Sequence, residues 1–154
     1  MENHPSYEEL ESVLLALEGM DQNPKLKHAH LGNALSLLHQ CLGEKSWVGL
    51  YLDEGDELIL GFFQGTPACE EIAYGKGVVG ECFIKNETMV VPDVTKHPNY
   101  ICCDSAAKSE ICVPMKRGDQ PFAILDIDLP YPYEFPANIR EIIEKITAKL
   151  ALFC

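Results

Sequence analysis

The chain has 154 residues, 47% of them hydrophobic, and a formal net charge of −12 at pH 7, which fits one globular domain with its own core. Its 12 basic residues are scattered, which argues against binding to nucleic acid or anionic lipid, because both need clustered Lys and Arg. No apolar run reaches the ~20 residues of a membrane-spanning helix, and residues 1–5 lack the basic start of a secretory signal. We therefore expect a cytoplasmic protein.

Seven cysteines are many for a chain of this kind. The number is odd, and the cytosol keeps thiols reduced, which argues against a structural disulfide framework. The sequence has no Cys-x-x-Cys and no Cys/His cluster with zinc spacing, so no metal site is predicted. What remains is redox or nucleophilic use of one or two thiols, with the others as packing.

Two helices are predicted at the N-terminal end. The first begins at Ser6, which forms a capping box with Glu9, and ends at Gly19. The second begins near Pro24, a residue suited to the first helical position, and ends at Gly43. Its buried stripe is predicted to be Leu31, Ala34, Leu35, Leu38 and Leu42.

A β-hairpin follows, with strands 47–52 and 57–63 joined by a turn at 53–56. In the first strand the even-numbered residues are aliphatic and must pack on the helices. The other face carries Trp47 and Tyr51 with Gly49 between them. That face suits the wall of a pocket, although the two rings could instead fill core space.

Residues 75–80 match Gly-x-Gly-x-x-Gly. A dinucleotide site would need this motif in a βαβ unit, whereas here it lies between a short strand at 70–73 and a short helix at 78–85, before a strand at 88–91. We interpret the glycines as a tight backbone approach and a helix start.

The loop at 100–110 contains adjacent cysteines, Cys102 and Cys103, with small residues around Lys108. It follows several turn-forming residues, so it is expected on the surface, where chemistry is usually placed. An accessible thiol there could be a reactive thiolate. The alternative is two small hydrophobic side chains packed under a loop.

A second hairpin is predicted from strands 110–115 and 121–128 across a loop at 116–120. Asp126 and Asp128 share one face of its second strand, and burying them would cost several kcal/mol each unless donors or a cation meet them. A solvated edge is the alternative. A final helix after Pro136 has Ile139, Ile142, Ile143, Ile146 and Leu150 on its buried stripe.

This order predicts an α+β fold with an antiparallel sheet and the helices on one face. The opposite face would display Trp47, Tyr51, Glu110, Asp126 and Asp128 beneath the loop that holds Cys103. An aromatic wall and an acidic floor suit a small cationic or zwitterionic ligand with an apolar group. Adjacent carboxylates also predict that one of them stays protonated near neutral pH.

Five segments together resemble the GAF-domain free methionine-(R)-sulfoxide reductases, in register from Trp47 to Asp128. They are Trp-Val-Gly-Leu-Tyr at 47–51, Leu-Gly-Phe-Phe-Gln-Gly at 60–65, the glycine motif at 75–80, Cys-Asp-Ser-Ala at 103–106 with Ser-Glu-Ile at 109–111, and Leu-Asp-Ile-Asp at 125–128. The resemblance implies a single GAF domain over residues 1–154. It also implies a six-stranded antiparallel sheet with terminal helices packed on one face and the ligand pocket on the other.

The resemblance further implies reduction of free L-methionine-(R)-sulfoxide without a cofactor, with an external thiol reductant such as thioredoxin, by a homodimer. Cys103 matches the cysteine that attacks sulfur, and Cys69 matches a cysteine that can form a disulfide with it. The remaining matches are the acids Glu110, Asp126 and Asp128, of which Glu110 or Asp126 would protonate the sulfoxide oxygen, and the substrate wall of Trp47 and Tyr51.

One departure concerns recycling, because members of this family commonly have a resolving cysteine where this chain has Val79. Cys69 is the first choice to replace it, and Cys82 and Cys102 are alternatives. Two other functions remain open: a GAF-type sensor that binds a small molecule without turnover, and a thiol redox sensor. The remaining cysteines, Cys41, Cys112 and Cys154, are predicted to be inert, the first two on apolar faces.

Overall fold

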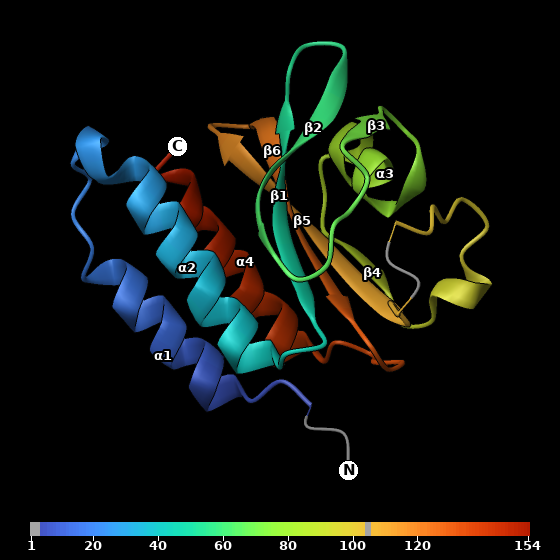
Figure 1. The fold of residues 1–154 in the computed structure, drawn as a ribbon, viewed down its shortest axis with the longest axis horizontal. Coiled ribbons are helices and arrows are strands. Elements are labelled where there is room, and N and C mark those ends of the chain that lie inside the picture. The colour runs from blue at the N-terminus through green and yellow to red at the C-terminus, as the bar shows by residue number, and fades with distance from the viewer. Residues whose placement is uncertain (1–3, 104–105) are drawn as a thin grey trace.

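A computed structural model describes residues 4–103 and 106–154 of the chain. Two parts of the chain used in the sequence analysis lie outside the described residues. They are Asp104 and Ser105 in the cysteine loop, and residues 1–3 of the N-terminal segment that was compared with a secretory signal. The described residues form a six-stranded antiparallel sheet in the order β3-β2-β1-β6-β5-β4, with helices against it (Figure 1). The predicted α+β architecture is confirmed.

The elements are α1 (Tyr7–Glu18), α2 (Lys27–Leu42), β1 (Trp47–Asp53), β2 (Glu57–Gln64), β3 (Glu71–Ala73), α3 (Gly77–Lys85), β4 (Met89–Val91), β5 (Ser109–Arg117), β6 (Gln120–Leu129) and α4 (Ala137–Ala151), with 3-10 turns at Pro24–Leu26 and Val94–Lys96.

The helices α1, α2 and α4 lie together against one face of the sheet (Figure 1). Ser6 caps α1, accepting a hydrogen bond from the backbone N–H of Glu9 at 3.4 Å. Pro24 begins a 3-10 turn, and α2 itself begins at Lys27. The buried stripes predicted for α2 and α4 are confirmed. Their aliphatic side chains pack on Val48 and Leu50 of β1.

The alternation predicted for β1 separates two packing regions. Val48 and Leu50 belong to the aliphatic core beneath the helices. Trp47 and Tyr51 belong to a second cluster on the opposite face, together with residues of α3. Each aromatic side chain is only 1% exposed, so it has a packing role as well as a place near a pocket.

The hairpin between β5 and β6 is tighter than predicted. The strands pair as far as Arg117 and Gln120, so the connection is Gly118-Asp119 and not the five residues 116–120. Gly118 has φ 61°, a left-handed conformation that glycine adopts at no steric cost and that two-residue hairpin turns require. The guanidinium of Arg117 also lies 4.1 Å from the centre of the Phe122 ring, a cation–π contact at the end of the hairpin.

The remaining α-helix, α3, covers the other face of the sheet (Figure 1). It begins at Gly77, with φ 63°. A Cβ on Gly80 would lie 2.7 Å from the carbonyl oxygen of Ala73, so the motif is a tight backbone approach and a helix start, as predicted. The flanking strands β3 and β4 lie at opposite edges of an antiparallel sheet, which is not the βαβ setting of a dinucleotide site.

Across the described residues, no helix combines the length and apolar character that crossing a membrane would take.

Substitution of Gly49 by alanine should destabilise the fold. A Cβ there would lie 2.2 Å from Cη2 of Trp47 and 2.8 Å from Cβ of Phe63, and such overpacking typically costs about 1–3 kcal/mol. Urea denaturation should show a lower free energy of unfolding for Gly49→Ala. The control is Gly32→Ala in α2, where a Cβ meets nothing within 4 Å and helix propensity should add up to about 1 kcal/mol. Equal stability of the two variants would contradict the close approach of Trp47 to Gly49.

Candidate active site

A small cavity lies on the α3 side of the sheet, over the first residues of β1 and β5 and the last residues of β6. Its volume is about 30 Å³. Six of the predicted site residues line it: Trp47, Tyr51, Cys103, Glu110, Asp126 and Asp128. Sequence reasoning assigned no site role to the others, which are Ala68, Ile72, Gly77, Val78, Val79, Tyr100 and Ile101. The alternation within strands identified the sheet face. The loop and α3 contributions depend on tertiary packing, for which the sequence carries no short-range signal.

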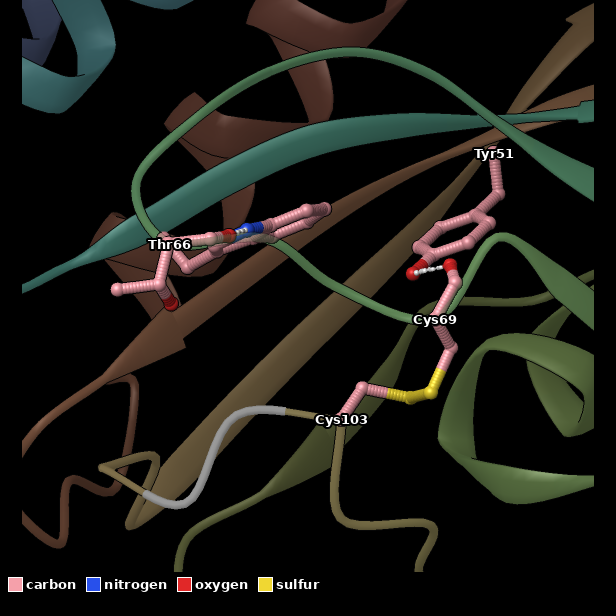
Figure 2. Close-up of a disulfide and its surroundings, with 5 residues drawn as sticks. Tyr51, Thr66, Cys69 and Cys103 are labelled. Carbon is pink, nitrogen blue, oxygen red and sulfur yellow. Dashed lines mark hydrogen bonds between the residues drawn. A yellow bond between two sulfur atoms is a disulfide. The ribbon is translucent and has the colours of Figure 1, made fainter.

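The aromatic wall is fixed by two hydrogen bonds to the loop between β2 and β3, residues 65–70. The Trp47 indole N–H donates to the carbonyl oxygen of Thr66 at 2.8 Å, and the Tyr51 hydroxyl donates to the carbonyl oxygen of Cys69 at 2.9 Å. Figure 2 shows the second of these bonds directly above the disulfide. The two rings stack with centroids 6.1 Å apart. Burial, and then the nearby carboxylates, raise the pKa of Tyr51, so it stays a neutral hydrogen-bond donor.

The acidic floor is built by strand register. Glu110 of β5 is paired with Asp128 of β6, and Asp128 is paired on its other side with Trp47 of β1. Asp126 lies two residues before Asp128 and therefore on the same face. Glu110, Asp126 and Asp128 are only 5%, 4% and 9% exposed. The solvated-edge alternative is therefore wrong, because β6 lies inside the sheet.

Burial changes the protonation of these acids. It raises the pKa of Glu110 well above the ordinary value for glutamate, and the negative charges of Asp126 and Asp128 add to the effect. Burial also raises the pKa of Asp126, against hydrogen bonds from Glu110 and Cys112 that lower it. Closely spaced carboxyl groups out of water cannot all ionise. The site therefore holds at least one carboxyl proton near neutral pH.

Cys69 and Cys103 form a disulfide beside this cavity, which Cys103 lines (Figure 2). Their Cα atoms are 5.3 Å apart and 34 positions apart in sequence. The bond joins the 65–70 loop to the loop before β5. The pairing implied by the resemblance is therefore present in the structure.

The other candidate thiols are less suitable for pairing with Cys103. Cys82 is fully buried in α3 and donates to the carbonyl oxygen of Glu87 at 3.3 Å. Burial raises its pKa, which disfavours the thiolate that exchange requires. Cys102 is exposed and free, next to Cys103 in sequence.

The loop that carries Cys103 is anchored to α3 by Glu81. The amide of Asn99 donates to Glu81 Oε1 at 2.8 Å and to the carbonyl oxygen of Gly75 at 2.9 Å, and Nε2 of His97 lies 2.7 Å from the same Oε1. Burial opposes ionisation of Glu81, but the hydrogen bonds from Asn99 and His97 lower its pKa. The sequence analysis missed this anchor, because a lone glutamate in a short helix carries no distinguishing pattern.

Cys112 lies in the hydrophobic cluster that holds Trp47 and Tyr51, as expected of an apolar face, but it also contacts two of the acids, which the sequence analysis did not predict. Its Sγ lies 3.3 Å from Glu110 Oε1 and 3.4 Å from Asp126 Oδ1. It follows Glu110 by two positions on one strand, so the two side chains share a face. That spacing was the signal that could have placed Cys112 beside the acids.

Within the described part of the chain, Glu110, Cys112 and Asp126 have ligand atoms close enough to share a metal ion, all within 4.8 Å of one another. Hydrogen bonds among protonated groups account for the same contacts. The sequence prediction that the site works without a metal therefore stays a prediction.

Comparison with known proteins agrees with this architecture. Residues 28–152 match the family model of the GAF domain. The free methionine-R-sulfoxide reductase of Saccharomyces cerevisiae is 37% identical over 153 residues, covering 94% of this chain and 85% of the yeast protein.

Two solved structures are similar over nearly the whole chain. The fRMsr of Staphylococcus aureus in complex with substrate has a TM-score of 0.84 and 38% identity, covering 98% of this chain and 97% of that one. The free methionine-R-sulfoxide reductase of Neisseria meningitidis in complex with its substrate has a TM-score of 0.82 and 32% identity, covering 94% and 86%. The chain therefore belongs to the GAF-domain family and, within it, to the free methionine-R-sulfoxide reductases.

Proposed function

We propose that this protein reduces free L-methionine-(R)-sulfoxide to methionine. The observation that carries the proposal is the Cys69–Cys103 disulfide beside a cavity that Cys103 lines together with three buried acids. Such a site combines a thiol pair able to supply two electrons with an acid able to supply a proton. The kinship with reductases of this activity supports the same conclusion.

The substrate is a zwitterion, and each part of it has a partner of matching chemistry in the site. Its ammonium group neutralises part of the negative charge of Asp126 and Asp128, which would otherwise be costly to bury. Its S-methyl group packs on the Trp47 ring, and the ring then selects one configuration at sulfur. The sulfoxide oxygen faces Glu110, whose pKa is raised well above the ordinary value for glutamate by burial and by the charges of Asp126 and Asp128.

The reaction begins when the Cys103 thiolate attacks the sulfur of the substrate. At the same time the sulfoxide oxygen takes a proton from the hydrogen-bonded pair of Glu110 and Asp126, called the acid pair below. A second proton and loss of water leave a sulfonium in which Cys103 Sγ is bonded to the methionine sulfur. Water then attacks Cys103 Sγ, which releases methionine and leaves a sulfenic acid. Cys69 condenses with this sulfenic acid to form the disulfide and a second water. Over these steps the sulfoxide is reduced and the two thiols are oxidised.

Recycling requires a dithiol that attacks the disulfide and leaves as a disulfide itself. We propose a thioredoxin-type protein as this reductant. We also retain as proposals a homodimeric assembly, a cytoplasmic location and the lack of a prosthetic cofactor, all implied by the family resemblance.

The thiol roles can be tested with the two epimers of free methionine sulfoxide. The wild type should consume the R epimer and not the S epimer in dithiothreitol, and Cys103→Ser should be inactive because it lacks the nucleophile. If the wild type bound the R epimer but did not turn it over, the proposed activity would be wrong and a GAF-type sensor would be favoured.

A single turnover without reductant should identify the resolving thiol. The wild type should release one methionine per chain and become lighter by about 2 Da, as a disulfide does, whereas Cys69→Ser should gain about 16 Da as a sulfenic acid. Intact-protein mass spectrometry reads both outcomes. Cys82→Ser serves as the control and should behave as the wild type. A disulfide mass that persists in Cys69→Ser would mean that another thiol resolves.

Asp128→Asn should lower catalytic efficiency roughly 10- to 150-fold, because a charge-assisted contact contributes ~1.5–3 kcal/mol. Steady-state kinetics with the R epimer and dithiothreitol would measure the loss. The matched control is Asp56→Asn, in the exposed turn between β1 and β2. If Asp128→Asn stayed within about twofold of the wild type, the proposed contact with the ammonium group would be wrong.

The oxidised protein should bind substrate poorly. A cavity of about 30 Å³ holds one or two water molecules, whereas ligand pockets usually span about 300–1,000 Å³. The loop tied down by Cys103 must therefore move before an amino acid enters. Isothermal titration with methionine should show affinity about tenfold or more weaker for the disulfide form than for Cys69→Ser, which cannot close. Equal affinities would contradict this.

A further inference from the structure

The proposed reaction does not use the Cys112 thiol, although Cys112 lies directly below the acids that the reaction needs. Cys112 of β5 is paired in register with Asp126 of β6. It is fully buried and does not line the cavity. A thiol in this position cannot reach the substrate. It can act only through its two carboxyl neighbours.

The contacts of Cys112 are those of a hydrogen-bond donor. Its Sγ lies 3.3 Å from Glu110 Oε1 and 3.4 Å from Asp126 Oδ1. Burial and the surrounding negative charge raise its pKa well above the ordinary value for a thiol, so it keeps its proton. A thiol has a single proton to donate, and of the two groups within reach an ionised carboxylate accepts it more strongly than a carboxylic acid.

Glu110, Cys112 and Asp126 are hydrogen-bonded to one another. The hydrogen bond from the thiol lowers the pKa of each acid, against the burial that raises it. Asp128, Tyr51 of β1 and Cys82 of α3 are the other titratable groups that act on this cluster. The thiol is therefore a donor to the Glu110–Asp126 pair when one of the two acids is ionised.

We propose that Cys112 is a positioning residue: its S–H donates to the ionised member of the Glu110–Asp126 pair and so stabilises the pair with one negative charge and one carboxyl proton, the proton that the sulfoxide oxygen takes. The transfer of that proton rests on the proposed function, whereas the hydrogen bonds of Cys112 do not.

The first test is the pH dependence of a single turnover by the fully reduced protein, measured for the wild type, Cys112→Val and Cys112→Ser. The rate should fall as pH rises through the apparent pKa of the acid pair, because the reaction consumes its proton. Each deprotonation of the pair puts more negative charge beside the thiol, so removing the donor raises both apparent pKa values. The profile of Cys112→Val should therefore shift up by about one pH unit.

Cys112→Ser keeps a donor at this position and should restore the profile of the wild type to within about half that shift. The control is Cys41→Val, which removes a thiol 3.8 Å from the carboxylate of Glu9, on the helical side of the sheet. It should leave the profile unchanged. A Cys112→Val protein with a lower rate but an unmoved profile would show a purely structural role and overturn the proposal.

The second test does not depend on activity and separates this proposal from the proposed function. A titration of the carboxyl 13C shifts of Glu110 and Asp126 in the reduced protein should show that the pair holds one carboxyl proton at neutral pH. Cys112→Val should raise the apparent pKa values of the pair by about one unit, and Cys112→Ser should reverse most of the change. Unchanged carboxyl titrations in Cys112→Val would refute the inference. If the wild type turned over no sulfoxide, the proposed function would fail and these shifts would still decide the role of Cys112.

Discussion

Three carboxyl groups and a thiol buried in the middle of a sheet are the constraint on which the rest of this molecule depends. Glu110, Asp126 and Asp128 lie on the two strands with the longest pairing in the sheet. Burying such groups costs several kcal/mol each unless they are neutralised or hydrogen-bonded. Shared protons and the thiol of Cys112 reduce that cost. Binding of a cation by these acids would reduce the cost of their burial further. The site therefore favours a ligand with an ammonium group.

The site has one part carried by the sheet and one part carried by loops. The acids and the aromatic wall stand on strands whose opposite face carries the aliphatic core beneath α1, α2 and α4. The close approach of Trp47 to Gly49 fixes the ring against the strand. The two cysteines, by contrast, are carried by loops outside the strands. Groups that must be preorganised are held by the core, and groups that must move to close a disulfide are not.

How far the sequence predicted this arrangement depended on the range of the interactions. Alternation in residues 47–52 and 123–128 identified the core face and the site face, because a strand repeats every two residues. The same rule places Cys112 beside Glu110, but an apolar surrounding sequence concealed it. The contacts of Glu81 with His97 and Asn99, and the tight turn at Gly118, depend on tertiary packing and on backbone torsion, which no local pattern records. The Cys69–Cys103 pairing came from the family resemblance alone.

Val79 and Cys69, the two positions considered for a resolving thiol, are held in different ways. Val79 lines the cavity from the first turn of α3 and is buried, so a thiol at that position would be held by a helix. Cys69 instead follows a loop whose backbone is bonded to Trp47 and, at Cys69 itself, to Tyr51. Opening of that loop would therefore disturb the aromatic wall as well as the disulfide. Because one loop carries the proposed resolving thiol and also accepts the hydrogen bonds of the aromatic wall, we expect reduction of the disulfide and reopening of the pocket to be coupled.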